Sequence, residues 1–288
     1  MKRTYLPKAI GFILCLFSWM LWPSITAVLA TALIILVVLG ALCIPVFNPR
    51  SSFYIPTFAK GNPAMPQVAL TFDDGPDPHY TPRILDQLQA ENIQAAFFVV
   101  GARTQDHPDL VRRIHEQGHV IGNHSQTHQL NFHFQSKAMI RKELDTFDAT
   151  LASIIGQRCR LFRSPQGFRT PLLSDVLRER GLACIGWSGR GLDSFRQDPK
   201  LILKALLKGL TGGSILLLHD GGGLGSRIER SATLETLPLL IREVRSRGLQ
   251  FARLDHLLAI EPYTDIKDQN PIESHMLAQD IKFTIKAR

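Results

Sequence analysis

From Gln67 onward, short apolar stretches alternate with amphipathic ones, and this alternation limits the possible folds more than any other feature of the chain. Strand-like apolar runs lie at 67–72, 95–100, 120–122, 160–163, 183–187, 214–219 and 250–254. Helix-like segments lie between most of them, at 82–92, 108–117, 137–155, 171–180, 199–209 and 233–247. Strands that alternate with helices form a parallel sheet, open or closed into a barrel. The fold class expected is α/β, a distorted or incomplete (β/α) barrel of about seven strands.

The N-terminal region carries a second pattern, a run from Ala9 to Phe47 without a charged residue. One membrane span requires about 20 residues, so the run can hold two short spans or one long, strongly tilted span. Trp22 and Pro23 lie before its middle, and tryptophan prefers the membrane interface, which favours a hairpin that turns near residues 22–24. A cleaved signal peptide is the competing interpretation, although its apolar core is expected to be about 7 to 15 residues long.

These patterns divide the chain into four regions. We expect a membrane anchor over residues 1–47, a linker over 48–66, a catalytic domain over 67–260 and a polar tail over 261–288. The linker is rich in Asn, Pro, Ser and Gly and has no periodic pattern. The protein is therefore expected to be integral to a membrane, for which the bacterial inner membrane is the natural candidate.

The orientation in that membrane can be predicted from basic residues on both sides of the apolar run. They are Lys2, Arg3 and Lys8 before it and Arg50 and Lys60 after it. The positive-inside rule then leaves both ends, and the catalytic domain, in the cytoplasm.

The composition narrows the function further. The 288 residues carry a formal charge of +8, but lysine and arginine are scattered rather than clustered, so nucleic-acid binding is not expected. A solvated basic surface, or one that faces anionic lipid headgroups, explains the charge instead. The four cysteines form no CxxC pair, which indicates neither a disulfide framework nor a cysteine zinc site. Nothing in the sequence indicates an oligomeric state.

Two adjacent carboxylates, Asp73 and Asp74, follow the first apolar run of the domain at the point where its strand should end. Adjacent carboxylates repel each other, so an unpaired duo is costly. A metal ion removes that objection, because it binds one carboxylate as an anion while the other stays free for proton transfer. Aspartate pairs are common on surfaces, however, so this interpretation needs support from other residues.

His124 and His128 supply that support. Four residues apart, both imidazoles lie on one face if the stretch is helical, and both can then reach a single metal ion. Asp74 could complete three ligands and leave one position for water. An isolated HxxxH is more often a pair of polar surface residues. Here the pair follows the strand end at 120–123 and so points to the same rim as the two aspartates.

Further polar residues follow later strands at the same rim. Arg163 follows the fourth apolar run, Asp193 lies beyond the fifth, and His219 and Asp220 end the sixth. In (β/α) barrels the active site gathers at the C-terminal ends of the strands. Asp193 and Asp220 could instead cap loops, and His219 could be a satisfied histidine of the core.

Four segments resemble, in order and spacing, the motifs of the NodB-homology polysaccharide deacetylases, carbohydrate esterase family 4. They are Thr71-Phe-Asp-Asp-Gly-Pro76, His124-Ser-Gln-Thr-His128, Arg163-Ser-Pro165 and Leu217-Leu-His219-Asp220. The resemblance covers roughly residues 66 to 258. It implies a metal-dependent hydrolase that removes N-acyl groups, usually acetyl, from amino sugars on a distorted barrel. The family is usually extracytoplasmic, in contrast to the orientation that the charge pattern favours.

The resemblance also implies a role for each matched residue. Asp73 falls at the general base, His219 at the general acid and Arg163 at the arginine that orients the base. The metal ligands would be Asp74, His124 and His128. Asp193 remains available to pair with Arg163 or with His219. Zinc fits this ligand set, and cobalt and manganese are alternatives.

Two departures from the family pattern alter the expected pocket. Gln166 stands where the third motif usually has an aromatic residue. Arg190 replaces the first of two usual acids, and Ser194 follows Asp193 in place of a tryptophan. An anionic substrate group, such as the phosphate of a lipid carrier, would suit Arg190 and Arg169.

Three functions follow as hypotheses. The first is an N-deacetylase of a surface polysaccharide or of a lipid-linked glycan precursor. The second is a deformylase of a lipid-linked amino sugar, which would release formate instead of acetate. The third is a catalytically inactive barrel that binds carbohydrate, although such a protein has no need to keep both aspartates and all three histidines of the motifs.

Overall fold

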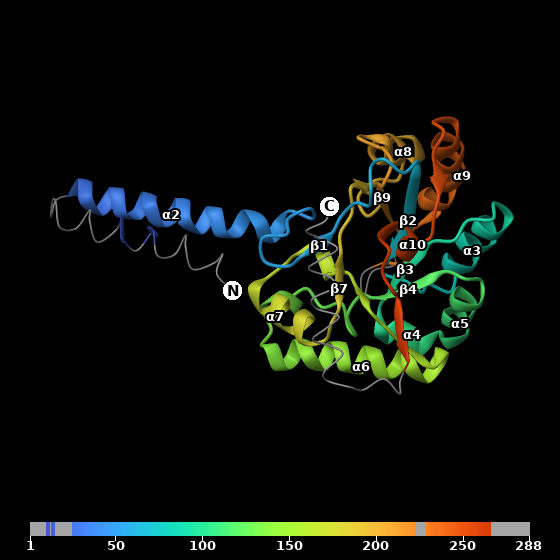
Figure 1. Cartoon of the computed structure of the whole chain (residues 1–288), viewed down its shortest axis with the longest axis horizontal. Coiled ribbons are helices and arrows are strands. Elements are labelled where there is room, and N and C mark those ends of the chain that lie inside the picture. Colours follow the sequence, from blue (N-terminus) through green and yellow to red (C-terminus); the bar gives the residue numbers. More distant parts are fainter. Residues whose placement is uncertain (1–9, 12, 15–24, 223–228, 266–288) are drawn as a thin grey trace.

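The computed structural model describes residues 10–11, 13–14, 25–222 and 229–265 (Figure 1). Its centre is a curled parallel sheet in which eight strands follow the order β1-β7-β6-β4-β3-β2-β9-β8, while β10 also pairs with β2. The strands are β1 (Thr57–Phe58), β2 (Gln67–Asp73), β3 (Ala96–Val99), β4 (Val120–Asn123), β5 (Gln157–Cys159), β6 (Leu161–Phe162), β7 (Ala183–Ile185), β8 (Gly189–Arg190), β9 (Ile215–His219), β10 (Gln250–Phe251) and β11 (Tyr263–Asp265). The incomplete (β/α) barrel is confirmed.

Most of the helices cover the outside of this sheet, whereas α10 packs against the interior core and α2 extends away from the domain (Figure 1). They are α2 (Ile25–Phe47), α3 (Thr81–Ala90), α4 (Gly101–Asp106), α5 (Pro108–Glu116), α6 (Lys137–Ile155), α7 (Pro171–Glu179), α8 (Pro199–Leu207), α9 (Ser231–Ser246) and α10 (Leu254–Leu258), with 3-10 turns η1 (Phe132–Phe134) and η2 (Pro165–Gly167). Proline occupies the first or second position of α3, α5, α7 and α8, where a missing N–H does no harm.

The sheet separates two hydrophobic cores because alternate residues of a strand face opposite sides. On β2, Val68, Leu70 and Phe72 pack against the outer helices, whereas Ala69 faces the barrel interior. A small residue suits the interior of a tightly curled sheet, and larger side chains such as Trp187 fill the rest of that space. All five side chains are buried.

The register of the parallel strands brings the polar strand ends together. Asp73 at the end of β2 pairs with His219 at the end of β9. Asn123 at the end of β4 pairs with Phe162 at the end of β6. His124 and Arg163, one residue further along, therefore lie at the same rim of the barrel.

Two short strands lie outside the predicted catalytic domain. β1 belongs to the segment predicted as a linker, and it pairs with β7 while Phe58 is buried. β11 belongs to the segment predicted as a tail, and it pairs antiparallel with β5. The hydroxyl of Tyr263 accepts a hydrogen bond of 2.7 Å from the backbone N–H of Ile121. The folded domain thus reaches Asp265. The sequence did not indicate these strands, because strands of two or three residues are too short to show a periodic pattern.

The last predicted strand, 250–254, is only partly correct. The strand β10 ends at Phe251, and Leu254 begins the helix α10, in which Leu257 and Leu258 are also buried. This three- and four-residue spacing is typical of a helix. A five-residue helix is too short for its periodicity to be distinguished from an apolar strand in the sequence.

The helix α2 is long and apolar enough to cross a membrane, although a signal sequence near the N-terminus would meet the same test. The predicted hairpin turn near residues 22–24 lies outside the described residues. Of the residues before it, Gly11 lies against α2, since a Cβ at this glycine would come within 2.9 Å of Val38 Cγ2.

Candidate active site

The two adjacent aspartates have different surroundings at the end of β2. Asp73 is the last residue of the strand, and Asp74 follows it with a left-handed φ of 73°. This conformation is uncommon for a residue with a side chain. The next residue must be a glycine, because a Cβ on Gly75 would lie 2.0 Å from the carboxylate of Asp220. The turn separates the two carboxylates that would otherwise repel each other.

Asp73 forms a buried ion pair with Arg163. The guanidinium donates a hydrogen bond of 2.7 Å from Nη1 to Asp73 Oδ1. It also donates to Thr71 Oγ1 at 2.8 Å and to the carbonyl of Gly186 at 3.1 Å, and it stacks over the Phe98 ring at 4.0 Å. Arg163 is fully buried. The arginine is therefore held rigidly, and it occupies one carboxylate oxygen of Asp73 while the other faces the site.

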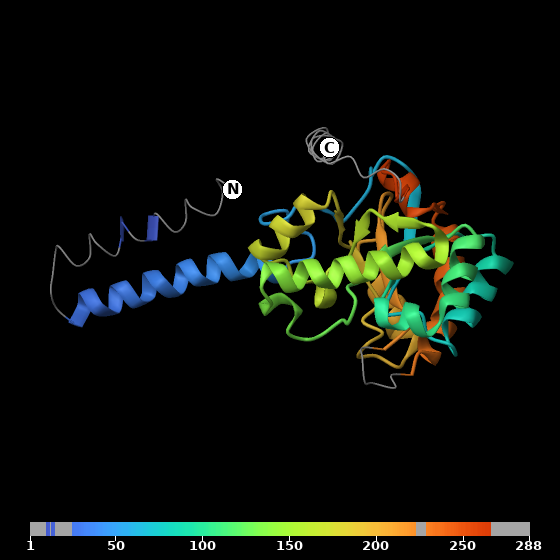
Figure 2. The same cartoon turned by 90° about the horizontal axis from the view of Figure 1, so that it is seen from below.

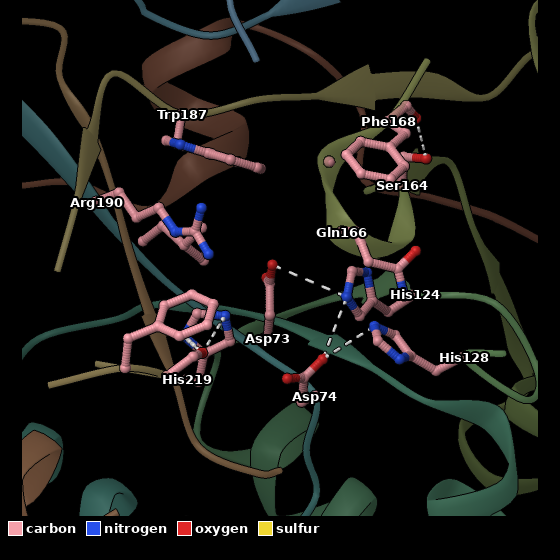
Figure 3. A pocket seen from close by; sticks show the side chains of 14 residues that line it. Asp73, Asp74, His124, His128, Ser164, Gln166, Phe168, Trp187, Arg190 and His219 are labelled. Atoms are coloured by element: carbon pink, nitrogen blue, oxygen red, sulfur yellow. Dashed lines mark hydrogen bonds and ion pairs between the residues drawn. The ribbon is translucent and has the colours of Figure 1, made fainter. Parts of the chain in front are cut away.

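Asp74, His124 and His128 converge as the sequence predicted (Figure 3). Asp74 Oδ1 lies 3.4 Å from His124 Nε2 and 3.3 Å from His128 Nε2. His124 Nδ1 lies 2.8 Å from the carbonyl oxygen of Arg163, to which we assign a donated hydrogen bond. This leaves His124 Nε2 as the free ring nitrogen on the side of Asp74. Two imidazole nitrogens and one carboxylate oxygen within 4.8 Å of one another suit a divalent metal ion.

The charge states of Asp74 and His128 also suit a cation. Burial lowers the pKa of His124, but the charges of Asp73 and Asp74 outweigh it and raise the pKa, so this position attracts positive charge. Burial raises the pKa of Asp74, but the three nearby histidines, His124, His128 and His219, outweigh it, so the net pKa is lowered. Burial and the neighbouring His124 lower the pKa of His128 to about 4. An ionised carboxylate and a neutral imidazole are the forms in which these groups bind metals.

The segment 124–128 is not the helix that was assumed for the histidine pair. It is a loop in which Ser125 and His128 have positive φ angles of 66° and 50°. Glu143, on the buried face of α6, accepts hydrogen bonds from the backbone N–H groups of Gln126 at 3.0 Å and Thr127 at 2.9 Å. No role was predicted for Glu143, although its helical spacing from Ile140, Leu144 and Phe147 indicates a buried carboxylate.

His219 pairs with Asp193 on the opposite side of the pocket. Asp193 Oδ1 lies 2.8 Å from His219 Nδ1, and its Oδ2 accepts from the His219 backbone N–H at 2.8 Å. Of the two partners left open by the sequence, Asp193 therefore takes His219 and not Arg163. Burial lowers the pKa of His219, but the charge and hydrogen bond of Asp193 outweigh it and raise the pKa.

Two further residues hold Asp193 in place. Thr233 Oγ1 donates to Asp193 Oδ2 at 2.9 Å, and Arg230 Nη1 donates to the Asp193 carbonyl at 2.9 Å. Arg230 directly precedes α9 and Thr233 lies in its first turn, far from Asp193 in the sequence, so no local pattern pointed to them. Asp220 is not among the described residues that line the pocket; it is buried behind Asp74 and accepts a hydrogen bond of 2.6 Å from Thr81.

The aspartates and histidines open into a cavity of about 340 Å³. Its 14 lining residues come from several strand ends (Figure 3), and Asp73 lies between His219 on one side and the two metal-type histidines on the other. Gln166 lines the cavity with a positive φ of 51°. The cavity thus places the Asp73 carboxylate, the imidazole of His219 and the cluster of Asp74, His124 and His128 around one space.

Arg190 forms part of the cavity wall, but Arg169 does not. The Arg190 guanidinium lies 5.8 Å from the Trp187 ring and 5.9 Å from the Phe195 ring, and it makes no ion pair with a described carboxylate. Arg169 is buried and donates to the carbonyl of Asn48 at 2.8 Å. The expectation that Arg169 faces an anionic substrate is therefore wrong, because this arginine fastens the segment before the domain.

Comparison with known proteins identifies relatives of this chain. Residues 60–185 match the family model described as polysaccharide deacetylase. The chain is 32% identical to a peptidoglycan-N-acetylglucosamine deacetylase of Bacillus cereus, over 66% of this chain and 87% of that protein. It is 36% identical to a chitooligosaccharide deacetylase of Sinorhizobium fredii, over 58% of this chain and 78% of that protein.

A solved structure shares the fold as well. A crystal structure of a peptidoglycan N-acetylglucosamine deacetylase in complex with 4-naphthalen-1-yl-N-oxidanyl-benzamide superposes with a TM-score of 0.67. The superposition covers 72% of this chain and 94% of that chain, at 27% sequence identity. The similarity thus extends over nearly the whole of that chain.

Proposed function

This chain belongs to the polysaccharide deacetylase family, carbohydrate esterase family 4, and we propose that it removes N-acetyl groups from amino sugars of a glycan by metal-dependent hydrolysis. One observation carries the proposal: Asp73, paired with Arg163, and His219, paired with Asp193, line a single cavity. The same cavity holds the metal-type cluster of Asp74, His124 and His128. The curated relatives bear names of peptidoglycan and chitooligosaccharide deacetylases, which makes N-acetylglucosamine polymers the first substrates to test.

In the proposed enzyme, Asp74, His124 and His128 hold the metal ion. Their donor set suits zinc, and cobalt or manganese would accept the same ligands. The hydrogen bond between His124 and the Arg163 carbonyl supports this role, because such outer partners orient a ligating imidazole. A bound divalent ion lowers the pKa of water and polarises the amide carbonyl of the substrate.

The protein side chains supply the proton transfers. Asp73, with Oδ1 held by Arg163, accepts the proton of the attacking water on its free oxygen Oδ2. The water oxygen bonds to the carbonyl carbon, and a backbone N–H near Gln166 stabilises the negative charge that develops on the carbonyl oxygen. His219, kept protonated by Asp193, donates a proton to the departing nitrogen. The C–N bond breaks, and acetate and a free amino sugar leave.

The two alternative functions make different use of the same cavity. A deformylase would need the same residues, but Leu217 and Trp187 give the cavity an apolar wall that favours an acetyl methyl group over a formyl hydrogen. An inactive carbohydrate-binding barrel is disfavoured because the base, the acid and all three ligands are present together.

We further propose that the substrate is anionic and lies at a membrane, as a lipid-linked glycan precursor does. Arg190 lines the cavity on a platform of two aromatic rings and lacks a described carboxylate partner, so a substrate phosphate can take that place. The apolar residues up to Phe47 would anchor the enzyme beside such a substrate. A reporter fused after Arg288 would establish on which side of the membrane the catalytic domain lies.

The full-length protein should be purified and incubated with N-acetylglucosamine oligomers, peptidoglycan and lipid-linked amino sugars in N-acetyl and N-formyl forms. Acetate, formate and free amine are then quantified. We expect acetate from the N-acetyl substrates, loss of that activity in a chelator and recovery with zinc. Preferential formate release would favour the deformylase, and no release from any substrate would favour the inactive barrel.

A further inference from the structure

The end of α2 is fastened to the catalytic domain rather than joined to it by a loose tether. The backbone N–H of Arg169 donates to the Val46 carbonyl at 3.1 Å, and its guanidinium donates to the Asn48 carbonyl at 2.8 Å. The hydroxyl of Tyr54 donates to the Leu42 carbonyl at 2.8 Å. The helix and the domain therefore have a defined relative orientation.

A further contact of α2 involves a residue of the active site. The rings of Phe47, the last residue of α2, and Phe168 meet edge to face at 4.9 Å between centroids. Phe168 lines the catalytic cavity. Only one aromatic side chain thus separates the end of the apolar helix from the space in which the substrate binds.

The length of α2 places the domain directly at the membrane surface. Its 23 residues extend over about 34 Å, whereas the hydrocarbon core of a bilayer is about 30 Å thick and takes about 20 residues. A hydrocarbon core that begins at the level of Ile25 ends near residue 44, so the carbonyl of Leu42 lies at the edge of the hydrocarbon core. Tyr54, which binds that carbonyl from the domain side, then sits at the interface, where tyrosine is enriched.

The domain exposes large apolar side chains on the side where α2 meets it. Leu130 and Phe134 are 84% and 89% exposed, and Met139 and Leu172 are also exposed. We call these four residues the apolar face. Leu130 precedes η1 and Phe134 is its last residue, in the loop that leads to α6. Met139 lies in the first turn of α6 and Leu172 in that of α7.

Neighbouring residues in the sequence, a ring contact and an ion pair link the apolar face to the segments that hold α2. Leu172 lies three residues after Arg169, and Phe134 follows His133, whose ring lies 5.3 Å from that of Phe168. An ion pair between Lys137 and Asp175 joins the start of α6 to α7. Figures 1 and 2 both show α7 next to the end of α2.

We propose that the apolar face inserts into the membrane interface, so that the catalytic cavity opens beside the bilayer. The inference rests on the membrane anchor of the proposed function. Exposed apolar patches mark interaction surfaces. Because the bilayer that holds α2 lies next to the apolar face, the face can reach the membrane interface without further movement of the domain. The partner of the apolar face is thus a lipid surface. A second copy of this chain, or another protein, would have to compete with the lipid for the face.

This placement has a consequence for the substrate. A glycan that is held at the membrane by its own lipid reaches the cavity along the wall formed by Phe168. A polymer chain that ends far from the membrane does not reach the cavity in this way. The enzyme is therefore expected to act on membrane-bound glycans faster than on the same sugar in solution.

The test is photochemical cross-linking of the full-length protein in nanodiscs of phosphatidylethanolamine and phosphatidylglycerol. A photoreactive benzoylphenylalanine replaces Phe134 or Leu172 in separate variants. The matched control replaces Leu201, which is 47% exposed against 42% for Leu172 but lies on α8, away from the end of α2 (Figure 1). Lipid adducts at Phe134 and Leu172 should exceed those at Leu201 by about tenfold, because only the first two reach the acyl boundary.

Equal adduct yields at all three positions would overturn the proposal. Cross-links from Phe134 and Leu172 to a second chain, without lipid adducts, would show that a protein covers the apolar face instead. The readout requires no catalysis, so it stands or falls independently of the deacetylase activity. The double variant Phe134→Ser, Leu172→Ser should then lose activity on lipid-linked substrate in vesicles while it keeps its activity on soluble oligomers.

Discussion

Arg163 donates a hydrogen bond of 2.7 Å to Asp73 Oδ1, and both side chains are buried within the rim of the barrel. The pair comes from the ends of two strands that are not neighbours in the sheet. It fixes one oxygen of the carboxylate and leaves the other for chemistry. A buried charge left without its partner is costly, which makes the pair testable through stability as well as activity.

Arg163→Ala should lower the free energy of unfolding by about 3–5 kcal/mol, because it leaves the Asp73 carboxylate buried without its countercharge. Denaturant unfolding at a fixed zinc concentration measures this. The matched control is Arg245→Ala, which breaks the exposed ion pair with Glu91 and should cost less than about 1 kcal/mol. Similar losses in the two variants would show that the buried pair has no special structural role.

The pair of Asp193 and His219 predicts a pH dependence. The carboxylate raises the pKa of His219 above its usual value of 6.5, and the protonated imidazole is the active form. Activity should therefore fall as the pH rises through this raised pKa. In Asp193→Asn the burial of His219 remains while the attraction is lost, so the alkaline limb of the kcat/KM profile should move to lower pH. An alkaline limb that stays in place would mean that His219 is not the acid.

The metal-type cluster predicts a measurable loss of metal. His128→Ala should weaken zinc binding by more than the roughly 10–100-fold that loss of an outer partner costs, because it removes a ligand itself. Titration calorimetry of the metal-free protein measures the affinity, and zinc should raise the melting temperature of the parent protein but not of the variant. His256→Ala, at an exposed position of α10, is the control and should bind zinc normally. Normal zinc binding by His128→Ala would remove this residue from the site.

Arg190 predicts a preference among substrates. Arg190→Gln should raise KM for a phosphate-bearing lipid-linked substrate about tenfold or more, since hydrogen bonds to charged groups contribute about 1.5–3 kcal/mol. Neutral chitooligosaccharides should be hydrolysed as before, because they have no group to pair with the guanidinium. Steady-state kinetics on both substrates provides the comparison. An equal change for the neutral and the charged substrate would contradict the proposed role.

The long elements of the fold were predictable from the sequence because their patterns are local. The helix at 137–155 has the predicted bounds, since Ser136 caps its start and Gly156 ends it with a φ of 74°. The short strands β1 and β8 and the helix α4 were not predicted. Two residues carry no periodicity, and α4 follows β3 almost directly, so only tertiary packing defines these elements.

The candidate site was predictable where a motif names the residue, and less so where a distant partner decides. The convergence of His124 and His128 on Asp74 was expected, but a strained loop brings them together instead of a helix. The partner of Asp193 stayed open until the fold placed His219 beside it. The supporting residue Glu143 lies in another element, and no spacing in the sequence links it to the loop that it holds.

The central claim is that Asp73 is the base of a metal-dependent deacetylase, and the rate of acetate release by Asp73→Asn tests it most directly. Asparagine can still accept the hydrogen bond of Arg163 but cannot take a proton from water. With zinc bound as in the parent protein, we predict a loss of about 10²–10⁴-fold in kcat/KM on N-acetylglucosamine oligomers. Acetate release at the parental rate by the zinc-loaded variant would contradict the account.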